Sequence, residues 1–268
     1  ADVRATVRGL MPLLTPKTDD AHLAKHVRET QRWWDKLRRY VDHGPSAKLI
    51  RPEHLAATVS ELADRDAIIS VDTGTPCMWV ARNLRAGGGR RIVGSLTWAS
   101  MASAAPYGFG AALAFPGRQV VAMCGDGGFT MLGLGDLITQ VRYGAPVVNV
   151  VFDNQQLDFV NIEQQEAGYI PYGTDMPNPD LAAVARALGA HGIRLTDPHD
   201  VREAVAEALA YRKGPVVLDA VVDPVALEMP SHVPAATAKG FTLSVAKRVF
   251  HGQIPELVHE LADNARIL

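Results

Sequence analysis

Cysteine and long apolar runs are both scarce in this sequence. The two cysteines, Cys77 and Cys124, form no CxxC pair and no metal-ligand spacing. Cys124 lies in the apolar run QVVAMCG, so we expect a reduced and buried thiol there rather than a disulfide. No apolar stretch reaches the ~20 residues that a helix needs to cross a bilayer. No basic segment followed by an apolar core opens the sequence, so we also expect no signal peptide.

The sequence also lacks an excess of charge of either sign. The formal net charge is -2 over 268 residues, which argues against a strongly charged partner such as nucleic acid. Hydrophobic residues make up 47% and charged residues 21%, so the chain can bury a full core. At roughly 150 residues per domain, this length suits one large domain, or one domain with appendages.

The middle of the chain alternates between short apolar runs and helical patterns. Strands are expected at 67–72, 91–95, 119–124, 146–152, 191–196 and 215–222. Helices are expected at about 52–64, 77–84, 101–113, 129–143, 179–188 and 198–211. Nearly continuous Val, Ile and Ala strands separated by helices predict an α/β fold, a doubly wound parallel sheet with helices on both faces. Such sheets bind ligands at the carboxyl ends of their strands.

The two ends of the chain leave this rhythm. Residues 4–14 and 21–41 have helical patterns, and we interpret 1–45 as the end of a preceding domain followed by a linker. Since the first residue is not Met, we expect the sequence to belong to a longer protein. The domain that carries the chemistry then spans 46–224, and residues 225–268 form a C-terminal tail.

Two oxygen-bearing side chains follow consecutive strands. Asp126 comes just after the strand at 119–124, and Asn154 comes just after the strand at 146–152. If these strands are neighbours, both side chains lie at one edge of the sheet, where they suit Mg²⁺ carrying a phosphate group. The glycines of GDGG (125–128) would let the backbone approach such an anion at the start of the next helix. The alternative is a tight turn in which Asp126 only caps the helix.

The same motif resembles the fingerprint of thiamine-diphosphate-dependent enzymes. GDG, followed after one strand–helix–strand crossover by Asp153-Asn154, is similar to that family's GDG…NN pattern. The resemblance implies Mg²⁺ ligands at the Asp126 carboxylate, the Asn154 amide and the backbone carbonyl of Gln156. One departure is Asp153, which stands where the fingerprint has its first Asn and adds a charge beside the site.

Two further segments extend the resemblance. The stretch TWASMASAAPYGFGAAL is similar to a family segment in which a Met supports the bent cofactor, a role that falls here on Met101. The alternative for Met101 is a core methionine on a helix of small residues. The stretch LDFVNIEQ resembles the pyruvate oxidase subgroup. That subgroup implies an aromatic at Phe159 that assists electron transfer to flavin, a bulky residue beside the substrate at Val160, and an active-site carboxylate at Glu163.

A solvated helix carboxylate is the alternative for Glu163. The full set of cofactor contacts that the resemblance implies is Ala99, Ser100, Met101, Asp126, Gly127, Gly128, Asn154, Gln155, Gln156, Leu157, Asp158, Phe159 and Val160.

Nearly the whole chain, including VDTGTP and AKGF, is most similar to pyruvate dehydrogenase (quinone), also called pyruvate oxidase. That family oxidatively decarboxylates pyruvate to acetate and CO₂ and passes electrons through FAD to a membrane quinone. The resemblance implies thiamine diphosphate and Mg²⁺ as cofactors and a homo-oligomer, dimeric or tetrameric. It also implies a cytoplasmic location, peripheral on the inner face of the cell membrane, with lipid as a partner.

The family's proton-activating Glu and its flavin domain lie on N-terminal domains that no part of this sequence resembles. We therefore expect residues 1–268 alone to be inactive. Two alternatives stay open. One is a non-oxidative thiamine-diphosphate enzyme, such as an acetolactate synthase or a 2-oxo acid decarboxylase. The other is a non-catalytic fragment that binds a diphosphate ligand.

The tail has a helical pattern of its own. From Ile254 onward, apolar residues lie on one helical face, at Ile254, Leu257, Val258, Leu261, Ala265 and Leu268. Surface-binding helices are usually more basic than this region, so one interpretation is a terminal helix packed on its own domain. The resemblance implies the other interpretation, a latch that leaves the active site and binds lipid.

Overall fold

In the computed structural model, the described residues are 2–41, 47–226, 234–254, 257–258 and 260. The chain forms two compact units, residues 1–39 and residues 40–268. The first unit contains α1 (Val3–Leu10), a 3₁₀ turn (Met11–Leu13) and most of α2 (Ala21–Val41), as the helical patterns predict. Asp2 caps α1, because its side chain accepts a hydrogen bond from the backbone N–H of Ala5.

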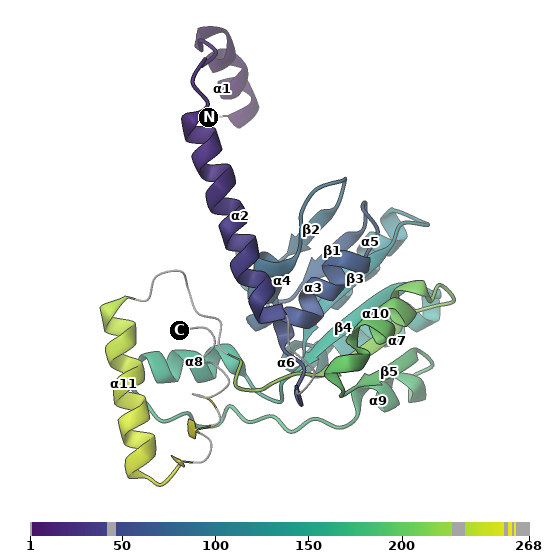
Figure 1. The fold of residues 1–268 in the computed structure, drawn as a ribbon. Coiled ribbons are helices and arrows are strands. Elements are labelled where there is room, and N and C mark those ends of the chain that lie inside the picture. Colours follow the sequence, from purple (N-terminus) through teal and green to yellow (C-terminus); the bar gives the residue numbers. More distant parts are fainter. Residues whose placement is uncertain (1, 42–46, 227–233, 255–256, 259, 261–268) are drawn as a thin grey trace. The chain divides into compact units, whose positions relative to one another are not determined.

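The second unit is built on one six-stranded sheet (Figure 1). All neighbouring strands are parallel, and their order is β2-β1-β3-β4-β6-β5. The strands are β1 (Ile68–Val71), β2 (Arg91–Gly94), β3 (Val120–Gly125), β4 (Val147–Asp153), β5 (His191–Leu195) and β6 (Val216–Val221). Each lies within about two residues of its expected position, so the predicted α/β fold with a parallel sheet is confirmed.

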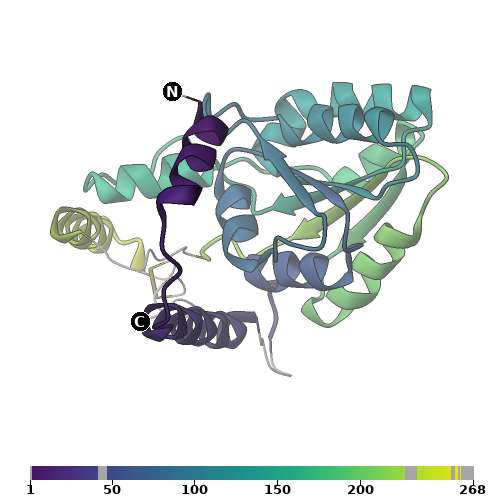
Figure 2. The same ribbon diagram turned by 90° about the horizontal axis from the view of Figure 1, so that it is seen from above.

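Helices cover both faces of this sheet (Figure 2). One core lies under α3 (Pro52–Leu62), α4 (Thr75–Asn83) and α10 (Val201–Ala210). The other lies under α5 (Ala104–Ala114), α7 (Leu134–Tyr143) and α9 (Leu181–Ala187). Successive residues of β3 alternate between the two cores, which is the side-chain period of a strand buried on both sides. Cys124 of β3 is buried, as expected.

The segment after β3 differs from the prediction. GDGG was expected as a turn before a helix at 129–143, but the helix begins at Asp126 with α6 (Asp126–Gly128). It continues through a π-helical turn (Phe129–Gly133) into α7. Gly125 is the N-cap of this helix, and within the first turn the carboxylate of Asp126 accepts a hydrogen bond from the N–H of Gly127. In contrast, α5 begins three residues later than expected, at Ala104.

Two helices were not predicted, α8 (Asp158–Glu166) and α11 (Ala235–Phe250). α8 is short and largely polar, so its sequence has little apolar periodicity. α11 lies in the segment that we interpreted only as a tail. Ser244 and Lys247 of α11 donate hydrogen bonds to the carbonyl oxygens of Tyr169 and Gly168, just past the end of α8.

The expected helix from Ile254 onward lies largely outside the described residues; of those described there, Leu257 and Glu260 are buried. No helix among the described residues is both long enough and apolar enough to span a membrane.

Candidate active site

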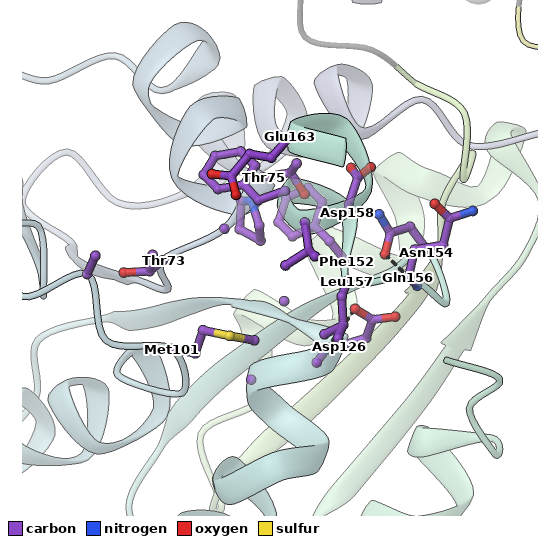
Figure 3. A pocket seen from close by; sticks show the side chains of 18 residues that line it. Thr73, Thr75, Met101, Asp126, Phe152, Asn154, Gln156, Leu157, Asp158 and Glu163 are labelled. Atoms are coloured by element: carbon purple, nitrogen blue, oxygen red, sulfur yellow. Dashed lines mark hydrogen bonds between the residues drawn. The ribbon is translucent and has the colours of Figure 1, made fainter. Parts of the chain in front are cut away.

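A cavity of about 210 Å³ opens at the carboxyl ends of β1, β3 and β4 (Figure 3). In the sheet, β2 lies on one side of β1, and β3 lies on the other side of β1. The direction in which the chain adds successive strands to the sheet therefore reverses between β1 and β3. Open α/β sheets bind ligands at such a switch point. The cavity is lined by Thr73, Gly74, Thr75, Pro76, Ala99, Met101, Gly125, Asp126, Gly127, Gly128, Phe152, Asn154, Gln156, Leu157, Asp158, Phe159, Val160 and Glu163.

Asp126 is the most deeply buried charged group of this cavity, with only 3% of its surface exposed. Its two carboxylate oxygens accept hydrogen bonds from the N–H of Gly127 at 2.8 Å and the N–H of Gln155 at 2.7 Å. Burial raises the pKa of Asp126 to about 7, and the nearby carboxylate of Asp153 adds to the rise. A cation bound to this carboxylate would lower the pKa and so oppose the effects of burial and of Asp153.

Asn154 and Gln156 extend from the end of β4 next to Asp126 (Figure 3). Since β3 and β4 are neighbours, with Gly125 paired with Phe152, the predicted proximity of Asp126 and Asn154 is confirmed. The Asn154 side-chain oxygen accepts a hydrogen bond from the N–H of Gln156 at 3.2 Å. Asn154 and Gln156 thus line the same cavity as Asp126.

The backbone around the cavity adopts conformations that non-glycine residues rarely take. Ala99, Ala102 and Gln155 have φ angles of 52°, 59° and 58°. At Gln155 this conformation accompanies the hydrogen bond that its N–H donates to Asp126. Such left-handed residues persist where the surrounding structure holds them, and they cluster at functional sites.

Close packing requires a glycine at Gly128 and leaves little room for a side chain at Gly127. A Cβ at Gly128 would lie 2.8 Å from the backbone nitrogen of Ala102, too close for any side chain. A Cβ at Gly127 would lie 3.1 Å from Leu157 and 3.3 Å from the methyl group of Met101. The absence of side chains at Gly127 and Gly128 therefore lets Met101 and the backbone of Ala102 approach the first turn of the helix.

Asp72, at the end of β1, is a site residue that was not predicted from the sequence. It accepts hydrogen bonds from the N–H of Ala104, which begins α5, at 2.7 Å and from the N–H of Gly125 at 3.3 Å. Burial raises the pKa of Asp72 to about 6, against the lowering effect of these N–H groups. Asp72 therefore ties together the ends of β1 and β3, on either side of the cavity.

The opposite wall is formed by the first two turns of α8. Asp158, Phe159, Val160 and Glu163 all line the cavity there. Burial raises the pKa of Asp158 to about 7, while a hydrogen bond with Thr75 lowers it. The contact between Asp158 and Thr75 joins α8 to the start of α4.

The structure gathers the predicted site residues around this one cavity, with two exceptions. Ser100 is exposed and does not line it, and Gln155 contributes through its backbone N–H rather than its side chain. The segment Thr73–Pro76, which leads from β1 into α4, was missed as a site segment, although it follows the end of the first strand and so had to lie at the same sheet edge. Among the described residues, the hydroxyl oxygen of Thr73 is buried without a hydrogen-bond partner.

The donor set suits a hard divalent cation that also carries a ligand. No group of three His, Cys, Asp or Glu side chains that could hold a metal is present within the described part of the chain. One carboxylate, one amide oxygen and one backbone carbonyl instead match Mg²⁺, which usually takes few protein ligands and completes its shell with phosphate and water.

Comparison with known proteins agrees with this geometry. Residues 72–220 match the family model for the C-terminal TPP binding domain of thiamine pyrophosphate enzymes. Thiamine pyrophosphate (TPP) is another name for thiamine diphosphate. The matched range runs from the end of β1 to β6 and therefore includes every segment that forms the cavity.

Individual relatives carry several activities in their names. The chain is 33% identical over 249 residues to the putative thiamine pyrophosphate-containing protein YdaP of Bacillus subtilis, covering 92% of this chain and 42% of YdaP. It is 27% identical over 226 residues to pyruvate oxidase of Lactiplantibacillus plantarum, covering 83% and 37%. It is 26% identical over 210 residues to acetolactate synthase of Bacillus subtilis, covering 76% and 36%. The chain thus spans less than half the length of each of these relatives.

Proposed function

This chain belongs to the thiamine pyrophosphate enzymes, and from that premise we propose that its cavity binds thiamine pyrophosphate with Mg²⁺ for the decarboxylation of pyruvate. One observation carries the proposal. The buried carboxylate of Asp126 at the end of β3 lies beside Asn154 and Gln156 at the end of β4, on a cavity edged by a glycine-rich helix start.

The residues of this chain divide the binding task. The side chains of Asp126 and Asn154 and the backbone carbonyl of Gln156 would hold Mg²⁺, and the cation would hold the diphosphate. The glycine-rich start of the helix would place backbone rather than side chains beside the same negative charge. Met101, which packs against Gly127, would support the cofactor from the cavity wall. When bound, thiamine pyrophosphate supplies the carbon nucleophile and the electron sink that allow a 2-oxo acid to lose CO₂.

We further propose that the intact protein is a pyruvate oxidase. Pyruvate and water would yield acetate, CO₂, two protons and two electrons, and the electrons would pass through FAD to a membrane quinone, which is reduced to the quinol. The placement of Phe159 and Val160 on the cavity wall, at the positions that resemble the oxidase subgroup, supports this proposal. Similarity to a protein named pyruvate oxidase supports it as well.

Acetolactate synthesis is the second candidate. The similarity of this chain to proteins named acetolactate synthase is comparable to its similarity to pyruvate oxidase. One acetolactate synthase large subunit is 30% identical over 212 residues. In that reaction a second 2-oxo acid, rather than a flavin, reacts with the carbon fragment left after decarboxylation. The two candidates therefore share the cofactor site and the loss of CO₂, and they differ in the acceptor used afterwards.

Anaerobic turnover of the intact protein separates the two candidates. We expect pyruvate, with thiamine pyrophosphate, Mg²⁺ and FAD present, to bleach the flavin absorbance and release one acetate per FAD reduced. The measurement combines stopped-flow absorbance with product analysis by NMR. Formation of acetolactate with an oxidised flavin would show that the oxidase proposal is wrong while leaving the cofactor site in place.

A further inference from the structure

Asn178 lies between two buried carboxylates. It is in the segment that precedes α9, and its side-chain nitrogen donates hydrogen bonds to Asp126 at 2.9 Å and to Asp153 at 2.8 Å. Asp126 and Asp153 have 3% and 0% of their surface exposed, so neither is well screened by water. One neutral amide therefore uses both of its protons to separate two like charges.

Arg194 completes the connection on the far side of Asp153. Its guanidinium donates to Asp153 at 3.2 Å and also pairs with Asp219, its register neighbour on β6. Asp219 in turn accepts hydrogen bonds from the N–H groups of Leu181 and Ala182 at the start of α9. The connected carboxylates of Asp126, Asp153 and Asp219 thus share a single guanidinium, which pairs with the last two, so negative charge remains in excess where a divalent cation is expected.

We propose that Asn178 is a positioning residue for the metal-binding carboxylate of Asp126. We propose too that the amide of Asn178 and the guanidinium of Arg194 together let this chain carry Asp153 at a position where the family fingerprint has Asn. This inference rests on the proposed function, because it assigns a role toward the Mg²⁺ ligand. Asn178 holds Asp126 by one oxygen, and Arg194 compensates the extra charge of Asp153.

Positions 153 and 178 should therefore be energetically coupled. Asn178→Asp removes both donated hydrogen bonds and places a third carboxylate against Asp126 and Asp153, which are already buried. Asp153→Asn removes the extra charge and can still accept from Asn178 through its amide oxygen. In the double variant, Asn at 153 supplies an amide and Asp at 178 supplies the charge, so the number of carboxylates returns to that of the native cluster.

The test measures thiamine pyrophosphate binding at fixed Mg²⁺ by calorimetry for the intact native protein, both single variants and the double variant. Changing partners of metal ligands typically costs 10–100-fold in affinity, so we expect a loss of about tenfold or more for Asn178→Asp. We expect Asp153→Asn to stay within about twofold and the double variant to recover most of the loss, because coupled neighbours are non-additive. A double variant as weak as Asn178→Asp, or native affinity in Asn178→Asp, would overturn the proposal.

A matched substitution separates positioning from general instability. Asn83→Asp also removes a buried amide donor, which bonds the carbonyl of Trp79, but it lies in α4 away from the cavity. It should lower the unfolding temperature without the affinity loss; an equal affinity loss would overturn the proposal. If Asn178→Asp does not fold, Asn178→Ala replaces it, with the same tenfold expectation. No Mg²⁺-dependent binding by the native protein would contradict the proposed function itself, whereas normal native binding with no coupling contradicts only this inference.

Discussion

Asp126→Ala should weaken the Mg²⁺-dependent binding of thiamine pyrophosphate by at least about 100-fold, since changes even to the partners of metal ligands cost 10–100-fold. The substitution removes the carboxylate that would bind the cation and so leaves the diphosphate without a firmly held cation. It also leaves the N–H groups of Gly127 and Gln155 without their acceptor. Calorimetric titration of the intact protein with the cofactor, at fixed Mg²⁺, measures the effect.

Asp136→Ala is the matched control for this prediction. Asp136 lies in the same continuous helix, in the first turn of α7, and it does not line the cavity. The same loss of a carboxylate should therefore leave cofactor affinity within about twofold, as expected for positions away from a site. Unchanged affinity in Asp126→Ala, or an equal loss in both variants, would show that Asp126 is not a ligand of the cation.

Gly240→Ala should detach α11 from the end of α8. A Cβ at Gly240 would lie 1.7 Å from the carbonyl oxygen of Glu166, so the two backbones cannot keep their present distance. Overpacking of this kind typically costs about 1–3 kcal/mol of unfolding free energy. Because α8 would lose the packing of α11, the backbone amides of α8 should exchange hydrogen faster. The change would also reach the cavity, since α8 carries Phe159 and Val160. Chemical unfolding and hydrogen exchange measured by mass spectrometry report the two effects.

Gly110→Ala is the control for this substitution. Gly110 lies in α5, and a Cβ there would meet no atom within 4 Å. Replacing an exposed helical glycine by alanine should stabilise the protein by roughly 0.5–1 kcal/mol, which is opposite in sign. Native stability and native exchange of α8 in Gly240→Ala would contradict the close packing of α11 on α8. The same packing gives a physical reason for the glycine of the AKGF segment.

The sheet and the central part of the site could be predicted because both depend on local signals. Strands buried on both faces, such as β3 and β4, give nearly continuous apolar runs. The more exposed β2 and the partly buried β5 were placed by the alternation of short apolar segments with helical patterns. The end of each run then located Asp126 and Asn154 at one edge, without knowledge of any contact. The resemblance added Met101 and the residues of α8, and the cavity lies against them.

The missing parts depend on contacts between residues far apart in the sequence. α8 has a weak pattern, and α11 packs against it across an intervening stretch that contains β5 and β6. Asp72 acts through N–H groups of two later segments. Asp153 looked like an unbalanced charge from the sequence. Its partners, Asn178 and Arg194, come from a later segment and from the edge strand β5, so only the folded structure brings them together.

The most direct test of the cofactor site is a titration of the intact native protein with thiamine pyrophosphate, with Mg²⁺ in one series and with a chelator in the other. Calorimetry gives both stoichiometry and affinity. We predict saturable binding of one cofactor per chain with Mg²⁺, and a loss of at least about 100-fold in affinity with the chelator, because the cation links the diphosphate to Asp126. Binding of equal affinity in both series, or no binding in either, would contradict the assignment of the cavity.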